Sequence, residues 1–159
     1  MTKSQKWTQT LAQSRQKLTA LLQSLTPEQW QTQIFSEGST WTVATAVSHI
    51  IDAERGMSIQ VHKARKGEPT IPEGFDIDRW NAKVQERIGD LSPAELLEKL
   101  DATRNKTLEV LNSLSEDEWS MTGRHPSRGI ITIEQYYETI AAHDQMHLTD
   151  VQKGLGIGE

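Results

Sequence analysis

Apolar side chains recur every three or four positions along four segments of the sequence, and polar side chains fill the positions between them. This spacing is typical of helices that bury one face against a core. It predicts long helices over residues 4–25 and 42–65, a third that begins near residue 93, and a fourth over residues 132–153.

Residues that stabilise helix ends flank three of these segments. Ser92-Pro93-Ala94-Glu95 is a capping box with proline at the first helical position, and it sets the start of the third helix. Thr42 and Thr132 stand where the second and fourth helices need N-caps. Gly154 and Gly156 end the last helix.

No segment sustains an alternation of apolar and polar residues at every second position, so we predict no sheet. The sequence therefore predicts an all-α four-helix bundle that forms a single domain over residues 1–159. The connection over residues 67–91 is long, and Trp80, Val84 and Ile88 predict a short extra helix within it. Such a crossover lets the second and third helices run parallel.

A faint internal repeat links the two halves of the sequence. Residues 25–30, LTPEQW, resemble residues 114–119, LSEDEW, at an offset of 89 positions. Thr42-Val43 and Thr132-Ile133 repeat at an offset of 90. These matches predict two helix–loop–helix halves related by a pseudo-twofold axis.

Composition excludes several classes of function. The 159 residues carry a net charge of −5, which argues against nucleic-acid binding because phosphate contacts need a concentrated positive surface. The absence of cysteine excludes disulfides, thiolate metal ligands and a cysteine nucleophile. No apolar run is long enough for a membrane span, and residues 1–11 lack the apolar stretch of a secretory signal. We expect a cytoplasmic protein without membrane contact.

Three of the five histidines form a candidate metal site. His143 and His147 are four residues apart, so they lie about 40° apart on one helical face, and that face is the inward side of the fourth helix or its margin. His49 lies in the second helix beside small residues that leave room for an ion or a ligand. Three neutral imidazoles suit a divalent transition metal. Ordinary core histidines with hydrogen-bond partners are the alternative.

Two acids fall near the centres of apolar stripes. Glu54 lies in the second helix and Asp144 in the fourth, 90 positions apart. A buried acid is costly without a partner, so we expect both to support the histidines, with Glu54 as a candidate general base. The alternative is a structural pair that bonds a tyrosine, an arginine or the backbone.

The loop over residues 121–129 carries polar side chains just before the fourth helix. His125 and Arg128 could line the mouth of a site and bind a cofactor, because loops often carry binding residues. A solvated polar loop is the alternative.

Taken together, these residues resemble the DinB/YfiT-like superfamily. The resemblance rests on residues 41–54 with His49, on residues 75–80, on the GRHP stretch at residues 123–126, and on AHDQMHL at residues 142–148. It covers nearly the whole sequence and is most specific where one histidine of the second helix combines with HDxxH in the fourth.

The resemblance implies an up-down-down-up bundle and a metal site formed by His49, His143 and His147. The metal it implies is zinc or nickel first, then iron or manganese. It also implies a homodimer and, for some relatives, a low-molecular-weight thiol as a cofactor. The function it implies is a metal-dependent enzyme that acts on a small molecule, as a thiol-dependent S-transferase or a hydrolase. A non-catalytic metal- or small-molecule-binding bundle of a stress response is the alternative.

Overall fold

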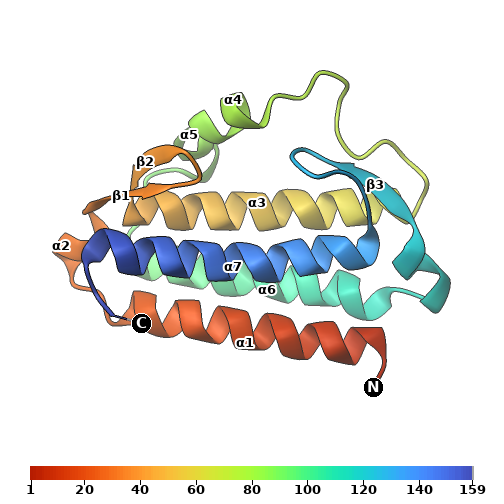
Figure 1. Cartoon of the computed structure of the whole chain (residues 1–159), viewed down its shortest axis with the longest axis horizontal. Coiled ribbons are helices and arrows are strands. Elements are labelled where there is room, and N and C mark those ends of the chain that lie inside the picture. The colour runs from red at the N-terminus through yellow and green to blue at the C-terminus, as the bar shows by residue number, and fades with distance from the viewer. Residues whose placement is uncertain (159) are drawn as a thin grey trace.

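The computed structural model describes residues 1–158, and four long helices dominate it (Figure 1). The helices and strands, in chain order, are α1 (Lys3–Gln23), α2 (Pro27–Trp30), β1 (Gln33–Ser36), β2 (Ser39–Thr42), α3 (Val43–Ala64), α4 (Ile77–Ala82), α5 (Val84–Ile88), α6 (Pro93–Ser113), the 3₁₀ helix η1 (Glu116–Ser120), β3 (Thr122–His125), β4 (Gly129–Thr132) and α7 (Ile133–Leu155). The predicted long helices agree with α1, α3, α6 and α7.

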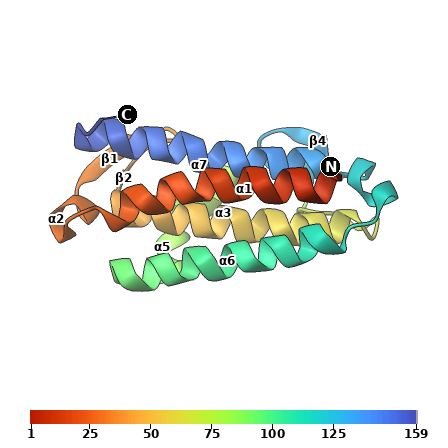
Figure 2. The same ribbon diagram turned by 90° about the horizontal axis from the view of Figure 1, so that it is seen from below.

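The long helices run up-down-down-up, as predicted. In Figure 1, α1 and α7 run from right to left, whereas α3 and α6 run from left to right. Figure 2 shows the same four helices from below, side by side along their length. The predicted caps form, because the side chains of Thr42, Ser92 and Thr132 each accept a hydrogen bond from a backbone N–H in the first helical turn. The crossover between α3 and α6 makes this order possible.

The prediction of no sheet was wrong, because each half of the chain carries a two-stranded antiparallel hairpin. Both hairpins consist of four-residue strands, which are too short to show a sustained alternation in the sequence. Burial does alternate within the first strand of each hairpin, where every second residue faces the bundle. The hairpins lie at opposite ends of the bundle (Figure 1).

The crossover contains two short helices where one was predicted. Within residues 65–92, α4 ends at Ala82 and α5 begins at Val84, and Lys83 between them leaves the helical conformation. Val84 and Ile88 are buried against the bundle core, as their four-residue spacing suggested. The crossover thereby lies along α3 (Figure 1).

The internal repeat corresponds to matching local structure. In the first half, the backbone N–H of Val43 donates to the carbonyl of Thr32 at 3.1 Å and closes the hairpin onto α3. In the second half, the backbone N–H of Ile133 donates to the carbonyl of Met121 at 2.8 Å and does the same for α7. Each half is therefore a long helix, a short helical turn, a hairpin and a second long helix.

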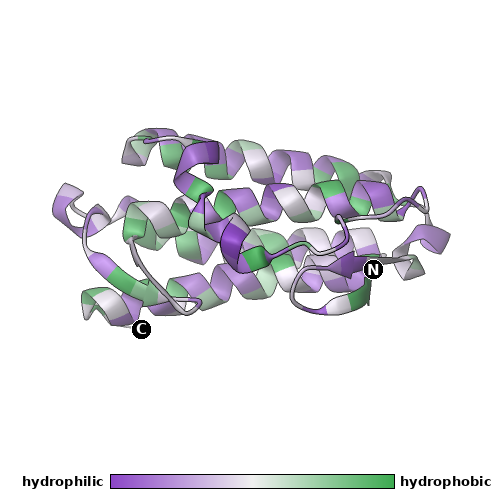
Figure 3. Cartoon of the chain, turned by 90° about the horizontal axis from the view of Figure 1, so that it is seen from above, coloured by the Kyte–Doolittle hydropathy of each residue, from purple (hydrophilic) through white to green (hydrophobic). Residues whose placement is uncertain are grey.

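The core consists of two apolar clusters, one towards each end of the bundle. One cluster includes Leu18, Ile51, Leu100 and Leu148, and the other includes Leu11, Val61, Leu111 and Ile140. Figure 3 shows hydrophilic residues interrupting the hydrophobic ones along every long helix. Among residues 1–158, no helix combines the length and the apolar character that crossing a membrane requires.

Candidate metal centre and its pocket

Three histidine rings from two helices meet on one side of the bundle. His49 comes from α3, and His143 and His147 come from successive turns of α7. The Nε2 atom of His143 lies 3.2 Å from Nε2 of His49 and 3.1 Å from Nε2 of His147. The structure thus brings together the three histidines that the sequence singled out.

A fourth group, Glu37, reaches the same point from the first hairpin. Its Oε2 lies 2.5 Å from Nε2 of His49, and its Oε1 lies 2.8 Å from Nε2 of His143. The sequence analysis missed this residue. Its sequence signal is the dipeptide Glu37-Gly38, in which glycine can adopt the positive φ of a two-residue hairpin turn.

The backbone of Glu37 is in an unfavourable conformation. Its φ is +49°, followed by +76° at Gly38, and the turn that joins β1 to β2 requires both positive values. Glycine adopts this region readily, whereas a glutamate there costs free energy. Local strain at a residue whose carboxylate meets three imidazoles is typical of a functional position.

Burial and charge set the protonation of this cluster. Burial, assisted by the charges of His143 and His49, lowers the pKa of His147 to about 2, so its ring is neutral. Burial would raise the pKa of Glu37, but hydrogen bonds from His143 and His49 outweigh burial and hold that pKa well below its ordinary value. The cluster therefore presents an ionised carboxylate and a neutral buried imidazole.

A hydroxyl and a second carboxylate orient His147 from behind. Ser36 Oγ donates to Asp150 Oδ2 at 2.7 Å and lies 3.0 Å from Nδ1 of His147. Because the hydroxyl hydrogen is directed at Asp150, Nδ1–H of His147 donates to Ser36 Oγ. That tautomer leaves the lone pair of Nε2 pointing into the cluster.

The donor set fits a divalent transition metal. The ligand atoms of Glu37, His49, His143 and His147 all lie within 4.8 Å of one another. Ligand atoms bound to zinc at about 2.0–2.1 Å in a tetrahedron are roughly 3.3 Å apart, close to the spacing of the imidazole nitrogens. Nitrogen lone pairs that converge at this distance repel one another unless a proton or a cation lies between them.

A pocket of about 590 Å³ opens beside the cluster, between α3, α7, the crossover and the second hairpin. Glu37, His49 and His143 form part of its wall. Apolar side chains form much of the remainder, including Met57, Ile71, Phe75, Trp80 and Met146. A concave apolar site with a few convergent polar groups is typical of small-molecule binding.

Asp52 holds the crossover against the pocket. It is buried on α3, and its Oδ2 accepts hydrogen bonds from Trp80 Nε1 at 2.9 Å and from Arg87 Nη2 at 2.6 Å. The guanidinium of Arg87 also lies 3.8 Å from the centre of the Trp80 ring. This anchoring fixes one wall of the pocket in place.

His125 and Arg128 both line the pocket, where the sequence placed them. His125 ends β3, and Arg128 lies in the turn before β4. Burial first, then the charges of Arg128 and His143, lowers the pKa of His125 to about 4, so this ring is neutral as well.

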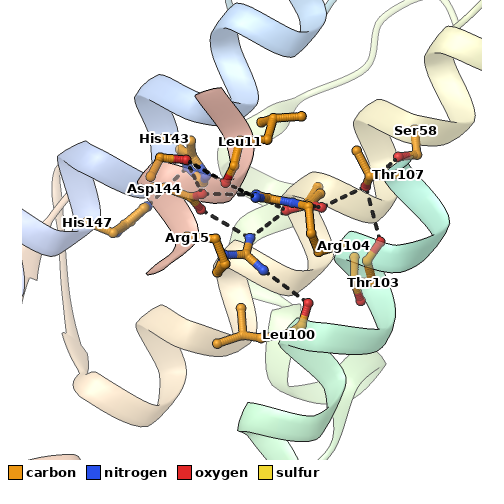
Figure 4. Close-up of polar contacts among 12 residues, drawn as sticks. Leu11, Arg15, Ser58, Leu100, Thr103, Arg104, Thr107, His143, Asp144 and His147 are labelled. Carbon is orange, nitrogen blue, oxygen red and sulfur yellow. Dashed lines mark hydrogen bonds and ion pairs between the residues drawn. The ribbon is translucent and has the colours of Figure 1, made fainter. Parts of the chain in front are cut away.

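Glu54 and Asp144 lie elsewhere, in a buried ion cluster with two arginines (Figure 4). Arg104 donates to Glu54 at 2.9 and 3.0 Å and to Asp144 at 2.9 Å, and Arg15 donates to both acids at 2.6 and 3.1 Å. Thr107 adds a bond to Glu54 at 2.6 Å. This arrangement corresponds to the structural alternative, in which the two acids bond an arginine. Neither acid is hydrogen-bonded to a histidine of the cluster within residues 1–158.

Comparisons with known proteins agree with this fold, and two of the proteins found have names that refer to metal dependence. A protein of Oceanobacillus iheyensis named "Putative metal-dependent hydrolase" is 26% identical over 128 residues, which cover 80% of this chain and 71% of that protein. YfiT from Bacillus subtilis is described as a probable metal-dependent hydrolase with an unusual four-helix bundle topology. It superposes on this chain with a TM-score of 0.76 at 22% identity, and the match covers 98% of this chain and 89% of YfiT.

Two further solved structures share the fold at lower identity. A mycothiol-dependent maleylpyruvate isomerase has a TM-score of 0.73 at 17% identity, covering 95% of this chain and 63% of its own. The colibactin self-resistance protein ClbS, in complex with a double-stranded DNA, has a TM-score of 0.73 at 19% identity, and the match covers 98% of this chain and 97% of ClbS. The fold therefore occurs in a DNA complex, and the expectation of no nucleic-acid binding rests on the charge of this chain alone.

The family is shown by a match that spans most of the sequence. The model of the DinB superfamily matches residues 10–151, which include every long helix in full or in large part, both hairpins and the histidine cluster. The chain belongs to the DinB superfamily.

Proposed function

We propose that this protein is a metal-dependent enzyme that acts on a small molecule in the pocket beside the histidine cluster. The observation that carries the proposal is the convergence of three imidazole nitrogens and one carboxylate at the wall of a 590 Å³ pocket. The proposed ligands are His49, His143 and His147, with the carboxylate of Glu37 beside the fourth position. A bound divalent metal would supply a Lewis acid that activates a water or a thiol at neutral pH.

Other residues of the chain orient a ligand, supply a base and exclude water. Ser36 and Asp150 hold the proton of His147 on Nδ1, so that Nε2 faces the cluster. Glu37 is the ionised carboxylate beside the cluster, and it takes over the general-base role that the sequence analysis gave to Glu54. The apolar walls formed by Phe75 and Trp80 limit water around the reacting groups.

Two reaction types follow from this site. Hydrolysis has support from the names of the Oceanobacillus relative and of YfiT. Transfer to a low-molecular-weight thiol has support from the mycothiol-dependent isomerase. We propose zinc or nickel as the metal, because three imidazoles suit both.

A specific observation favours a second candidate, a non-catalytic metal-binding protein. Glu37 already occupies the position where a fourth ligand would lie, and a tetrahedral site filled by protein groups is typical of a structural metal. The pocket favours the enzyme, because Glu37 lies on an exposed turn and keeps 25% of its side-chain surface accessible. A substrate could therefore displace its carboxylate.

The test is the metal content of the untagged protein, purified without chelators, beside His147→Ala and His62→Ala. His62 is an exposed histidine of the same helix as His49 and serves as the matched control. We expect about one equivalent of a transition metal in the wild type and in His62→Ala, and at least a 100-fold weaker affinity in His147→Ala. A wild type that takes up no zinc, nickel, iron or manganese would remove the chemical basis of the proposal.

The variant Glu37→Gln separates the two candidates. For an enzyme that uses Glu37 as a base, the variant keeps its metal and loses activity towards hydrolase and thiol-transfer substrates. For a structural site, the variant loses metal affinity, and the wild type turns over none of these substrates.

A further inference from the structure

The second hairpin presents hydrogen-bond donors to the pocket that no residue within the described part of the chain uses. Nδ1 of His125 accepts hydrogen bonds from the backbone N–H groups of Ser127 at 3.1 Å and of Arg128 at 3.2 Å. A nitrogen that accepts from two backbone donors carries no proton, so the proton of this neutral ring is on Nε2. His125 therefore offers Nε2–H as a donor, and within residues 1–158 this atom has no hydrogen-bond partner.

Arg128 keeps one complete edge of its guanidinium free. Its Nη1 donates to Thr139 Oγ1 at 2.5 Å and to the carbonyl of Gln135 at 3.3 Å, and this pair of bonds anchors the side chain on α7. No described residue accepts a hydrogen bond from Nε or Nη2. This Nε–Nη2 edge is the one that binds a carboxylate with two parallel hydrogen bonds. The nearest acid, Glu138, lies 3.6 Å from Nη1, on the other side of the guanidinium, and is exposed.

The acids of the pocket wall leave these donors without a partner. The wall contains two carboxylates, Asp52 and Glu37. Asp52 is occupied by Arg87, Arg55 and Trp80, and Glu37 is occupied by the histidine cluster. The two carboxylates of the pocket wall are thus bonded within the chain, whereas donors on the second hairpin remain available for a ligand.

We infer that the pocket binds a small carboxylate, with its anionic group on the Nε–Nη2 edge of Arg128 and on Nε2–H of His125, and with its apolar body against Phe75 and Trp80. The inference rests on the proposed function and names its substrate class. Thr139, which anchors Arg128, precedes His143 by four residues, a rise of about 6 Å along α7. A ligand held at Arg128 therefore places an atom a few bonds away beside the histidine cluster.

The test compares 4-phenylbutyrate with its neutral amide, 4-phenylbutyramide, by calorimetry on the protein as purified. The two probes share the apolar body and differ in charge. We expect the acid to bind about tenfold tighter than the amide, the difference that charge-assisted hydrogen bonds give. Arg128→Gln should abolish this preference and leave the affinity for the amide unchanged.

Two variants control for the fold of the hairpin. His125→Asn keeps an oxygen where Nδ1 accepts from the backbone of Ser127 and Arg128, but it deletes the Nε2–H donor, so it should reduce the preference severalfold. Arg124→Gln removes the same charge from an exposed arginine of the same hairpin that does not line the pocket, so it should keep the preference.

Three results would overturn the inference. They are equal affinity for acid and amide, no binding of the acid in the millimolar range, and a preference that persists in Arg128→Gln and disappears in His147→Ala. The last result places the carboxylate at the histidine cluster. Metal uptake measured on the same preparation tests the proposed function separately, because a protein that takes up no zinc, nickel, iron or manganese and still prefers the acid refutes the metalloenzyme and leaves the carboxylate site standing.

Discussion

Two groups of polar side chains contain residues of the same two helices, α3 and α7, but they differ in how their members are bonded. In the ion cluster, two arginines face two carboxylates, and every carboxylate oxygen accepts from at least one arginine, threonine or serine (Figure 4). In the histidine cluster, three imidazole nitrogens and a carboxylate point at one another, and all are acceptors except where a ring nitrogen carries a proton. In the ion cluster, the positive charges of the two arginines match the negative charges of the two carboxylates.

The difference shows how to separate a structural polar group from a functional one. Arg15, Glu54, Arg104 and Asp144 lie between the two apolar clusters of the core, and all are at most 8% exposed. Their charges pair with one another in a polar layer in the middle of the bundle, and of their side-chain polar atoms Nε of Arg15 has no hydrogen-bond partner within residues 1–158. The histidine cluster has a surplus of acceptors and adjoins a pocket, so protons or, under the proposed function, a metal ion must lie between its members.

The largest effect is expected where the balanced cluster loses a cation. Arg104→Met leaves Glu54 and Asp144 with one arginine between them, and breaking a buried ion pair costs about 3–5 kcal/mol. Urea unfolding, monitored by circular dichroism, measures the free energy of unfolding. Lys99→Met, on the exposed face of the same helix, is the control and should stay within about 0.5 kcal/mol of the wild type. Equal stability of the two variants would show that the cluster contributes little.

Acid should remove the stability that Glu54 contributes to the same cluster. Burial would raise the pKa of Glu54, but bonds from Arg104 and the charges of Arg104 and Arg15 outweigh burial and hold that pKa below its ordinary value of 4.5. A depressed carboxyl pKa adds stability above the unfolded-state value, and this stability is lost as the pH falls through the folded-state value.

Glu54→Gln removes this titration and provides the measurement. The difference in unfolding free energy between wild type and variant should be constant above about pH 5.5 and should shrink below 4.5. A difference that stays unchanged down to acid pH would mean that Glu54 does not titrate with folding.

A smaller effect is expected for the residue that orients His147. Ser36→Ala removes the acceptor of the His147 Nδ1 proton, and loss of such an outer partner costs about tenfold or more in metal affinity. Competition against a chromogenic chelator measures the dissociation constant. Ser39→Ala, at the paired position of the neighbouring strand, should leave it unchanged, and Ser36→Thr should restore it. Unchanged affinity in Ser36→Ala would limit Ser36 to hairpin packing.

The smallest effect on stability is expected for Glu37, and it distinguishes this acid of the histidine cluster from Glu54 of the ion cluster. Glu37→Asn relieves the positive φ in the turn but removes the carboxylate that is hydrogen-bonded to His49 and His143. These two effects oppose each other, so we expect the free energy of unfolding of the metal-free protein to change by no more than about 1 kcal/mol. Thermal unfolding of the metal-free protein measures it. A clear loss of stability would show that Glu37, like Glu54, stabilises the fold by itself.

Much of the fold could be predicted because helix patterns are local. The spacing of apolar residues and the caps at Thr42, Ser92 and Thr132 gave the long helices to within a few residues. The hairpins were not predicted, because a four-residue strand contains too few alternating positions to be distinguished from chance. The predicted pair His143 and His147 was accessible for the same local reason, since four residues make about one helical turn.

The roles of the acids could not be read from periodicity. A helical wheel places Glu54 and Asp144 on the inward face, but it cannot tell whether an inward acid meets an arginine or a histidine of another helix. Arg15 and Arg104 lie in α1 and α6, far from both acids in sequence, and only their packing shows the pairing. Glu37 was missed because it belongs to a turn, where no periodicity marks the direction of a side chain.

The sequence by itself determined the mostly helical class, the positions of the long helices, the internal repeat and the three candidate histidines, because each depends on spacing along the chain. The tertiary structure decided which of the inward polar side chains share a cluster, since that depends on the register between helices that are distant in sequence. It placed Glu37 at the histidines and bound Glu54 and Asp144 to arginines. The physical reason is burial: a charge in the core is costly without a partner, and only the groups that packing brings within hydrogen-bond distance can serve as that partner.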